Sequence, residues 1–91
     1  MSSPIGGKKN VKIFVLYLME NINYPLDYVT INDIVMQTDY VMYLDFAEGF
    51  NEMLDGGLVE KLSLDGEELY FVTEKGKHVA REFNGDILST I

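Results

Sequence analysis

The sequence predicts a mainly helical domain of the α+β class that carries one small β-hairpin. Asp65-Gly66 stands between two runs of β-forming residues, and this dipeptide favours a two-residue hairpin turn. Gly56-Gly57 precedes the first run and can close a helix in the left-handed conformation. Thr73 follows the second run and offers a hydroxyl that can cap another helix. A helix therefore ends before the hairpin, and another begins after it.

Three helices are expected before the hairpin. Residues 11–20 are apolar on nearly all sides, which is typical of a helix buried on more than one side. Residues 30–33 form a variant of the capping box, so a second helix should run from there to about Gln37. After a turn at residues 38–40, a third helix is amphipathic. Its apolar face carries Tyr43, Phe46, Ala47, Phe50, Met53 and Leu54, and its opposite face carries Asp45, Glu48, Gly49, Glu52 and Asp55.

The hairpin turn fixes a register for the two strands. A two-residue loop at 65–66 places Leu62 opposite Leu69 and Val59 opposite Val72, which are favourable cross-strand pairs. A last helix should then run to about Phe83, because Asn84-Gly85 is a plausible stop. The resulting order, α-α-α-β-β-α, is that of a winged helix-turn-helix, with the second and third helices as the helix-turn-helix.

The length and composition predict one small domain. With 91 residues the chain can bury one core, so we expect a flexible tail at 1–10, a winged-helix domain at 11–85 and an apolar tail at 86–91. The chain has no cysteine, which excludes disulfides and thiolate chemistry. Its longest apolar run, residues 13–19, is far short of the roughly 20 residues that a membrane span needs. With no signal-peptide pattern either, the sequence favours a cytoplasmic protein without a membrane partner.

Charge is distributed unevenly along the chain. The net charge is −8, and residues 20–68 hold twelve acidic residues and one basic residue, Lys61, which gives −11 for that window. DNA affinity depends largely on basic groups that neutralise phosphates. The sequence thus places acid where a DNA-binding winged helix normally carries a basic face.

Three segments carry a resemblance to known winged-helix families. The motifs GLVEK at 57–61 and YFVTEKGK at 70–77 resemble the wing and following helix of the multiple-antibiotic-resistance and phenolic-acid regulator superfamilies. The segment LYLMENINYPLDYVTINDIV at 16–35, with that hairpin, is similar to an uncharacterised winged-helix family of Gram-positive bacteria, a domain of unknown function. The resemblance covers residues 11–83. It implies DNA binding, and a homodimer built by the first and last helices.

Catalysis finds little support in the sequence. His78 is the only histidine and has no nucleophile to pair with, so a surface histidine is the favoured interpretation. The acidic residues of the third helix fit a solvated face better than a metal site. The glycines match neither phosphate-binding motif. We therefore expect no enzymatic activity and no metal or other cofactor.

Two functions of different class remain open. The first is a DNA-binding transcription regulator, and the second is an acidic protein-interaction or dimerisation module that faces a basic protein partner without binding DNA. Tyr40 and Tyr43 lie where a helix-turn-helix presents side chains to bases. Tyr43 falls on the apolar face, so packing is its favoured role. Tyr40 is therefore the freer of the two to contact DNA. The other candidate DNA contacts are Lys61 and Ser63 in the hairpin and Lys8, Lys9 and Lys12 near the start of the chain. The candidate dimer interface consists of Ile13, Leu16, Met19, Phe83, Ile87 and Leu88.

Overall fold

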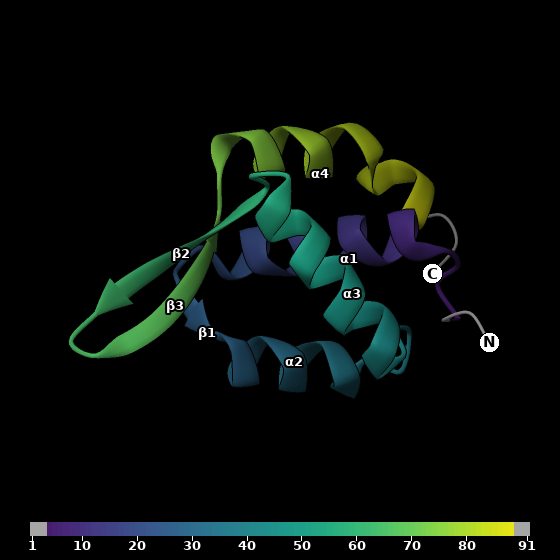
Figure 1. Ribbon diagram of the computed structural model, residues 1–91. Coiled ribbons are helices and arrows are strands. Elements are labelled where there is room, and N and C mark those ends of the chain that lie inside the picture. Colours follow the sequence, from purple (N-terminus) through teal and green to yellow (C-terminus); the bar gives the residue numbers. More distant parts are fainter. Residues whose placement is uncertain (1–3, 89–91) are drawn as a thin grey trace.

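The computed structural model describes the backbone of residues 4–88 and the side chains of residues 4–82. Four helices form a body with a small antiparallel sheet at one end, and the hairpin projects from this body (Figure 1). The strands lie in the order β1-β3-β2, and α2 and α4 lie on opposite sides of α1 and α3 (Figure 1). The elements are α1 (Lys8–Ile22), β1 (Leu26–Asp27), α2 (Tyr28–Gln37), α3 (Tyr43–Asp55), β2 (Val59–Leu64), β3 (Glu67–Val72) and α4 (Glu74–Leu88).

The hairpin has the predicted register. Leu62 pairs with Leu69, and Val59 pairs with Val72. Asp65 and Gly66 have φ angles of 51° and 83°, the positive values that a type I′ turn requires. The turn dipeptide therefore sets the pairing of β2 with β3 from local sequence alone.

The start of the chain differs from the predicted tail. Residues 1–3 lie outside the described part, but α1 begins at Lys8 rather than at residue 11. Ile5 is buried, and its N–H donates to the carbonyl oxygen of Tyr40 at 3.0 Å. The Asn10 amide donates to the Ile5 carbonyl oxygen at 3.0 Å. One apolar side chain with two hydrogen bonds thus attaches this segment to the core.

Strand β1 was not predicted from the sequence. It consists of Leu26 and Asp27, which pair with Tyr70 and Leu69. This two-residue strand is held by its partner in the sheet and has no local periodicity that could reveal it. Helix α2 then starts two residues before the predicted Thr30, with Asp27 as the preceding cap residue and the Thr30 hydroxyl donating to Asp27 Oδ1.

Helix α4 begins as predicted but ends later. The Thr73 hydroxyl accepts from the N–H of Gly76 at 3.1 Å and donates to the carbonyl oxygen of Gly57 at 2.7 Å, so it caps α4 and attaches it to the end of α3. Gly76 is required here, because a Cβ at this position would collide with the Leu58 carbonyl oxygen. The helix continues through Asn84-Gly85 to Leu88, and residues 89–91 of the predicted apolar tail lie outside the described part.

The core is centred on four aromatic rings from three elements. Phe50 of α3 has its ring 5.3 Å from Tyr28 of α2, 5.6 Å from Phe46 and 5.1 Å from Tyr70 of β3, measured between centroids. Phe46 and Phe50 are both buried. The pairs of Phe50 with Tyr28 and Tyr70 are edge-to-face, a geometry that adds to the stabilisation that burial provides. The cluster joins the helix-turn-helix to the hairpin.

Replacing Phe50 with alanine should destabilise the fold strongly. Truncation would open a cavity between α2, α3 and β3, and Phe→Ala changes in cores cost about 3–5 kcal/mol. Chemical denaturation followed by circular dichroism would measure the change in the free energy of unfolding. Leu44→Ala is the matched control, because Leu44 lies on the same helix and is 71% exposed. Equal, small effects of the two changes would contradict the assigned core.

Candidate nucleic-acid interface

The turn between α2 and α3 is held by short-range hydrogen bonds. It spans residues 38–42, two residues beyond the predicted turn, and Asp39 adopts a left-handed φ of 61°. The Thr38 hydroxyl donates to the Val35 carbonyl oxygen at 2.7 Å and accepts from the Tyr40 N–H at 3.3 Å. Because the backbone of Tyr40 also binds Ile5, the turn presents the start of α3 in a defined orientation.

The two candidate tyrosines have roles opposite to those predicted. Tyr40 is half-buried, and its ring packs edge-to-face on Phe14 at 5.8 Å. Tyr43 is the first residue of α3 and is 54% exposed. The longer turn leaves Tyr40 outside the helix, over α1. Tyr43 is therefore the accessible side chain, and the preference for Tyr40 as a DNA contact was wrong.

One side of α3 exposes uncharged side chains, next to Asp45 in the first turn and to Glu48. We define the α3 tip as Tyr43, Leu44, Ala47 and Asn51, which lie on the accessible side of the helix and of which Ala47 is half-buried. Gly49, predicted on the polar face, is buried instead, because α1 approaches it: a Cβ there would lie 3.2 Å from Cγ of Lys12. The tip has the place and exposure of a groove-reading surface.

Lysines of α1 bind the carboxylates of α3. Lys8 Nζ lies 2.8 Å from Glu52 Oε2 and 3.1 Å from Glu48 Oε2, and Lys12 Nζ lies 2.9 Å from Glu52 Oε1. The hydrogen bond from Lys8, followed by that from Lys12, holds the pKa of Glu52 below its ordinary value. The same carboxylates raise the pKa of Lys8, chiefly through the bond to Glu52. We call this group the α1–α3 ion network.

The ion network changes how the predicted DNA-binding lysines must be interpreted. Lys8 and Lys12 bind carboxylates of α3, so their positive charge is used within the fold. Lys9 is exposed on α1. These three lysines lie on one helix, apart from the candidate residues in the hairpin.

The hairpin offers little positive charge. Lys61 Nζ lies 3.6 Å from Glu68 Oε1 across the two strands, and Ser63 is exposed nearby. Exposed carboxylates surround them, including Glu60, Asp65 and Glu67. The hairpin is therefore net acidic and should repel a phosphate backbone.

The predicted dimer residues of α1 are not on the surface. Ile13, Leu16 and Met19 are at most 6% exposed within the single chain, because α1 is the central helix of the fold. They form core rather than an interface, so that part of the prediction was wrong. The side chains of Phe83, Ile87 and Leu88 on α4 lie outside the described residues.

Three further features concern the histidine, metal binding and membrane spans. His78 is exposed on α4, as predicted, with Nε2 3.3 Å from Glu82 Oε2. Among the residues described, no group of three or more His, Asp or Glu side chains is arranged to hold a metal ion. No helix in that same part of the chain is long and apolar enough to cross a membrane.

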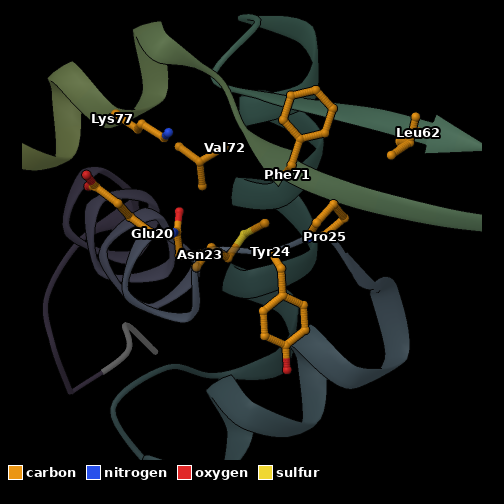
Figure 2. Close-up of a pocket in the computed structure, with 9 residues that line it drawn as sticks. Glu20, Asn23, Tyr24, Pro25, Leu62, Phe71, Val72 and Lys77 are labelled. Atoms are coloured by element: carbon orange, nitrogen blue, oxygen red, sulfur yellow. The ribbon is translucent and has the colours of Figure 1, made fainter.

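A pocket at the foot of the hairpin was not found by sequence reasoning (Figure 2). It has a volume of about 390 Å³. Figure 2 shows Leu62 and Phe71 on the hairpin side, Tyr24 and Pro25 on the loop side, and Lys77 on α4. Its lining comes from four separate segments, so no local motif could have revealed it. The residues that line it are Met19, Glu20, Asn23, Tyr24, Pro25, Leu62, Phe71, Val72 and Lys77.

The sequence matches the model of one known protein family. A family model described as a domain of unknown function (DUF4364) matches residues 11–91. The chain belongs to this family. Among curated proteins, none matches the DUF4364 chain.

Two solved structures share the fold of this DUF4364 chain. SSV1 F-93 is 21% identical with a TM-score of 0.72, and the match covers 98% of this chain and 94% of that chain. A transcriptional regulator of the MarR family from Silicibacter pomeroyi is 15% identical with a TM-score of 0.68, and the match covers 94% of this chain and 56% of that chain. The winged-helix fold is therefore shared with a transcriptional regulator.

Titration of Glu52 would test the ion network. Its carboxyl group should titrate below the ordinary range, because both lysines favour its charged form. This pairing stabilises the fold fully at pH values above the pKa of Glu52 in the unfolded chain. The stabilisation is lost as the pH falls through the pKa of Glu52 in the folded protein. In Lys8→Met and Lys12→Met variants, the pKa of Glu52 measured by carboxyl NMR should rise. An unchanged pKa in both variants would contradict the network.

Proposed function

We propose that this protein is a DNA-binding transcription regulator of the winged-helix type that reads DNA through the α3 tip. The observation that carries the proposal is a set of accessible, uncharged side chains, those of the α3 tip, on the second helix of a helix-turn-helix. Asn51 could pair bidentately with adenine, and Leu44 and Ala47 offer apolar contact to a thymine methyl group. The likeness in fold to a transcriptional regulator supports the same function.

The α1–α3 ion network lowers the electrostatic barrier to this function. An acidic helix in the major groove would repel phosphates. Here Glu52 binds two ammonium groups and Glu48 binds one of them, so these two carboxylates of α3 carry their own counterions. The tip can then approach bases with a smaller penalty than the sequence suggests. A role on DNA would place the protein in the cytoplasm and would require no enzymatic activity.

Neutralising Glu52 should strengthen DNA binding. In Glu52→Gln, Lys12 loses its carboxylate partner and becomes available to phosphates, whereas Lys8 keeps its pairing with Glu48. Affinity for pooled genomic fragments should rise at low salt, and the plot of log affinity against log salt should steepen by roughly 1 for each new phosphate contact. An electrophoretic shift titration at two ionic strengths measures both effects.

Glu82→Gln supplies the control for net charge. Glu82 is an exposed carboxylate on α4 that contacts His78, so the substitution adds the same charge away from α3. It should leave DNA affinity nearly unchanged. If neither wild type nor Glu52→Gln binds DNA at the lower salt, the regulator function is rejected and the fold stands.

The acidic hairpin favours a second candidate function. A net-acidic wing suits a basic protein partner better than DNA. The protein would then act as an interaction or dimerisation module that does not bind DNA. Absence of DNA binding at low salt, with binding to a basic protein that weakens as salt rises, would favour this candidate.

We also propose a homodimer formed through the C-terminal part of α4. Phe83, Ile87 and Leu88 recur at helical spacing there, and α1 contributes no exposed Ile13, Leu16 or Met19. Light scattering at high micromolar concentration should return twice the 10.4 kDa chain mass. Ile87→Asp should halve the measured mass, and a wild-type monomer would reject the dimer.

A further inference from the structure

The hairpin carries an uncovered apolar face. Side chains alternate along a strand, and the register places Leu62 and Leu64 of β2 beside Leu69 and Phe71 of β3. Val59 and Val72 are buried on the other side, towards the core. Leu62 and Leu64 are 38% and 54% exposed, so no described element covers them. We define the hairpin outer face as Leu62, Leu64, Leu69 and Phe71.

This face continues into the pocket at the foot of the hairpin. Leu62 and Phe71 line both, and the pocket extends to Pro25 and to Tyr24, which is 65% exposed. Figure 2 shows Phe71 and Leu62 along the hairpin and Pro25 between them and Tyr24. Its volume of about 390 Å³ lies in the range of pockets that enclose a ligand group. Apolar strips of this kind, ending in a pocket for an anchoring side chain, are typical of protein interfaces.

The charges around the face select the occupant. Glu60 and Glu67 share the face by strand alternation, and Asp65 lies in the turn. Among the described residues that line the pocket, Lys77 is the only cation. A second copy of this chain, with a net charge of −8, would be repelled by these carboxylates. Nucleic acid would be repelled for the same reason.

We propose that the hairpin outer face and its pocket bind a basic amphipathic segment of a partner protein. An apolar residue of the segment occupies the pocket, further apolar residues cover Leu62 and Leu64, and its lysines or arginines face Glu60 and Glu67. The charge of Lys77 at the α4 end is offset by Glu20, which lines the same pocket, and by Glu74 at 3.7 Å, so it does not oppose these cations. This inference does not rest on DNA binding, because the α3 tip and the hairpin outer face are formed by different residues.

A model peptide provides a direct test. The probe is a short, fluorescently labelled amphipathic peptide of leucine and lysine, and its charge-reversed form is the same peptide with glutamate for lysine. Fluorescence anisotropy should show binding of the lysine form alone. The double variant Leu62→Ser, Leu64→Ser should weaken that binding by at least about tenfold, since burial of even one leucine is worth that factor.

Matched variants distinguish binding at this site from non-specific binding of the peptide. The control Val29→Ser, Leu44→Ser removes two comparably exposed apolar side chains from α2 and α3 and should leave peptide affinity unchanged. Glu60→Gln, Glu67→Gln should slow association at low salt, whereas Asp55→Asn, Glu82→Gln, which change exposed carboxylates at the end of α3 and on α4, should not. Circular dichroism melting confirms that each variant is folded, and a misfolded leucine variant is replaced by Leu64→Ser alone.

Several outcomes would overturn the proposal. They are absence of binding by the lysine peptide, equal binding of the glutamate peptide, and equal weakening by the control variants. A wild-type dimer that becomes monomeric in Leu62→Ser, Leu64→Ser would also overturn it, because the face would then bind a second copy of the chain.

Discussion

The aromatic cluster of Tyr28, Phe46, Phe50 and Tyr70 is the interaction on which the rest of the structure depends. Its members come from α2, α3 and β3, and neighbouring rings lie 5.1–5.6 Å apart. Because Phe50 contacts rings on both other elements, it fixes the position of α3 relative to the hairpin. The α3 tip and the hairpin outer face are therefore presented by one rigid core.

The contact between α1 and α3 determines the electrostatic character of the site. Gly49 lets α1 approach closely, so the stem of Lys12 lies against α3. Its ammonium group and that of Lys8 then reach Glu52. Close packing and charge pairing are thus coupled, since a bulkier residue at Gly49 would displace Lys12. As a result, Glu48 and Glu52 of α3 bind lysines of α1, and the four residues of the α3 tip carry no charge.

Local signals predicted the hairpin register and the Thr73 cap, because a turn dipeptide and a capping hydroxyl act within a few residues. The sequence did not predict the exchange of roles between Tyr40 and Tyr43, which depends on where the turn ends. The sequence also could not tell whether Leu16 lies in the core of one chain or in a dimer interface, since both environments favour apolar residues. The lysine–glutamate pairs join positions 40 or more residues apart, and the pocket draws on four segments. Tertiary packing decides each of these features.

Mapping DNA contacts by NMR tests the central claim, that the α3 tip reads DNA while lysines of the ion network pair with the carboxylates of Glu48 and Glu52. Backbone amide shifts of the labelled protein would be followed as a short A·T-rich duplex is added at low salt. The account predicts that the largest changes fall on Tyr43, Leu44, Ala47 and Asn51, with small changes at Leu62 and Leu64. Changes confined to the hairpin, or none at all, would contradict it.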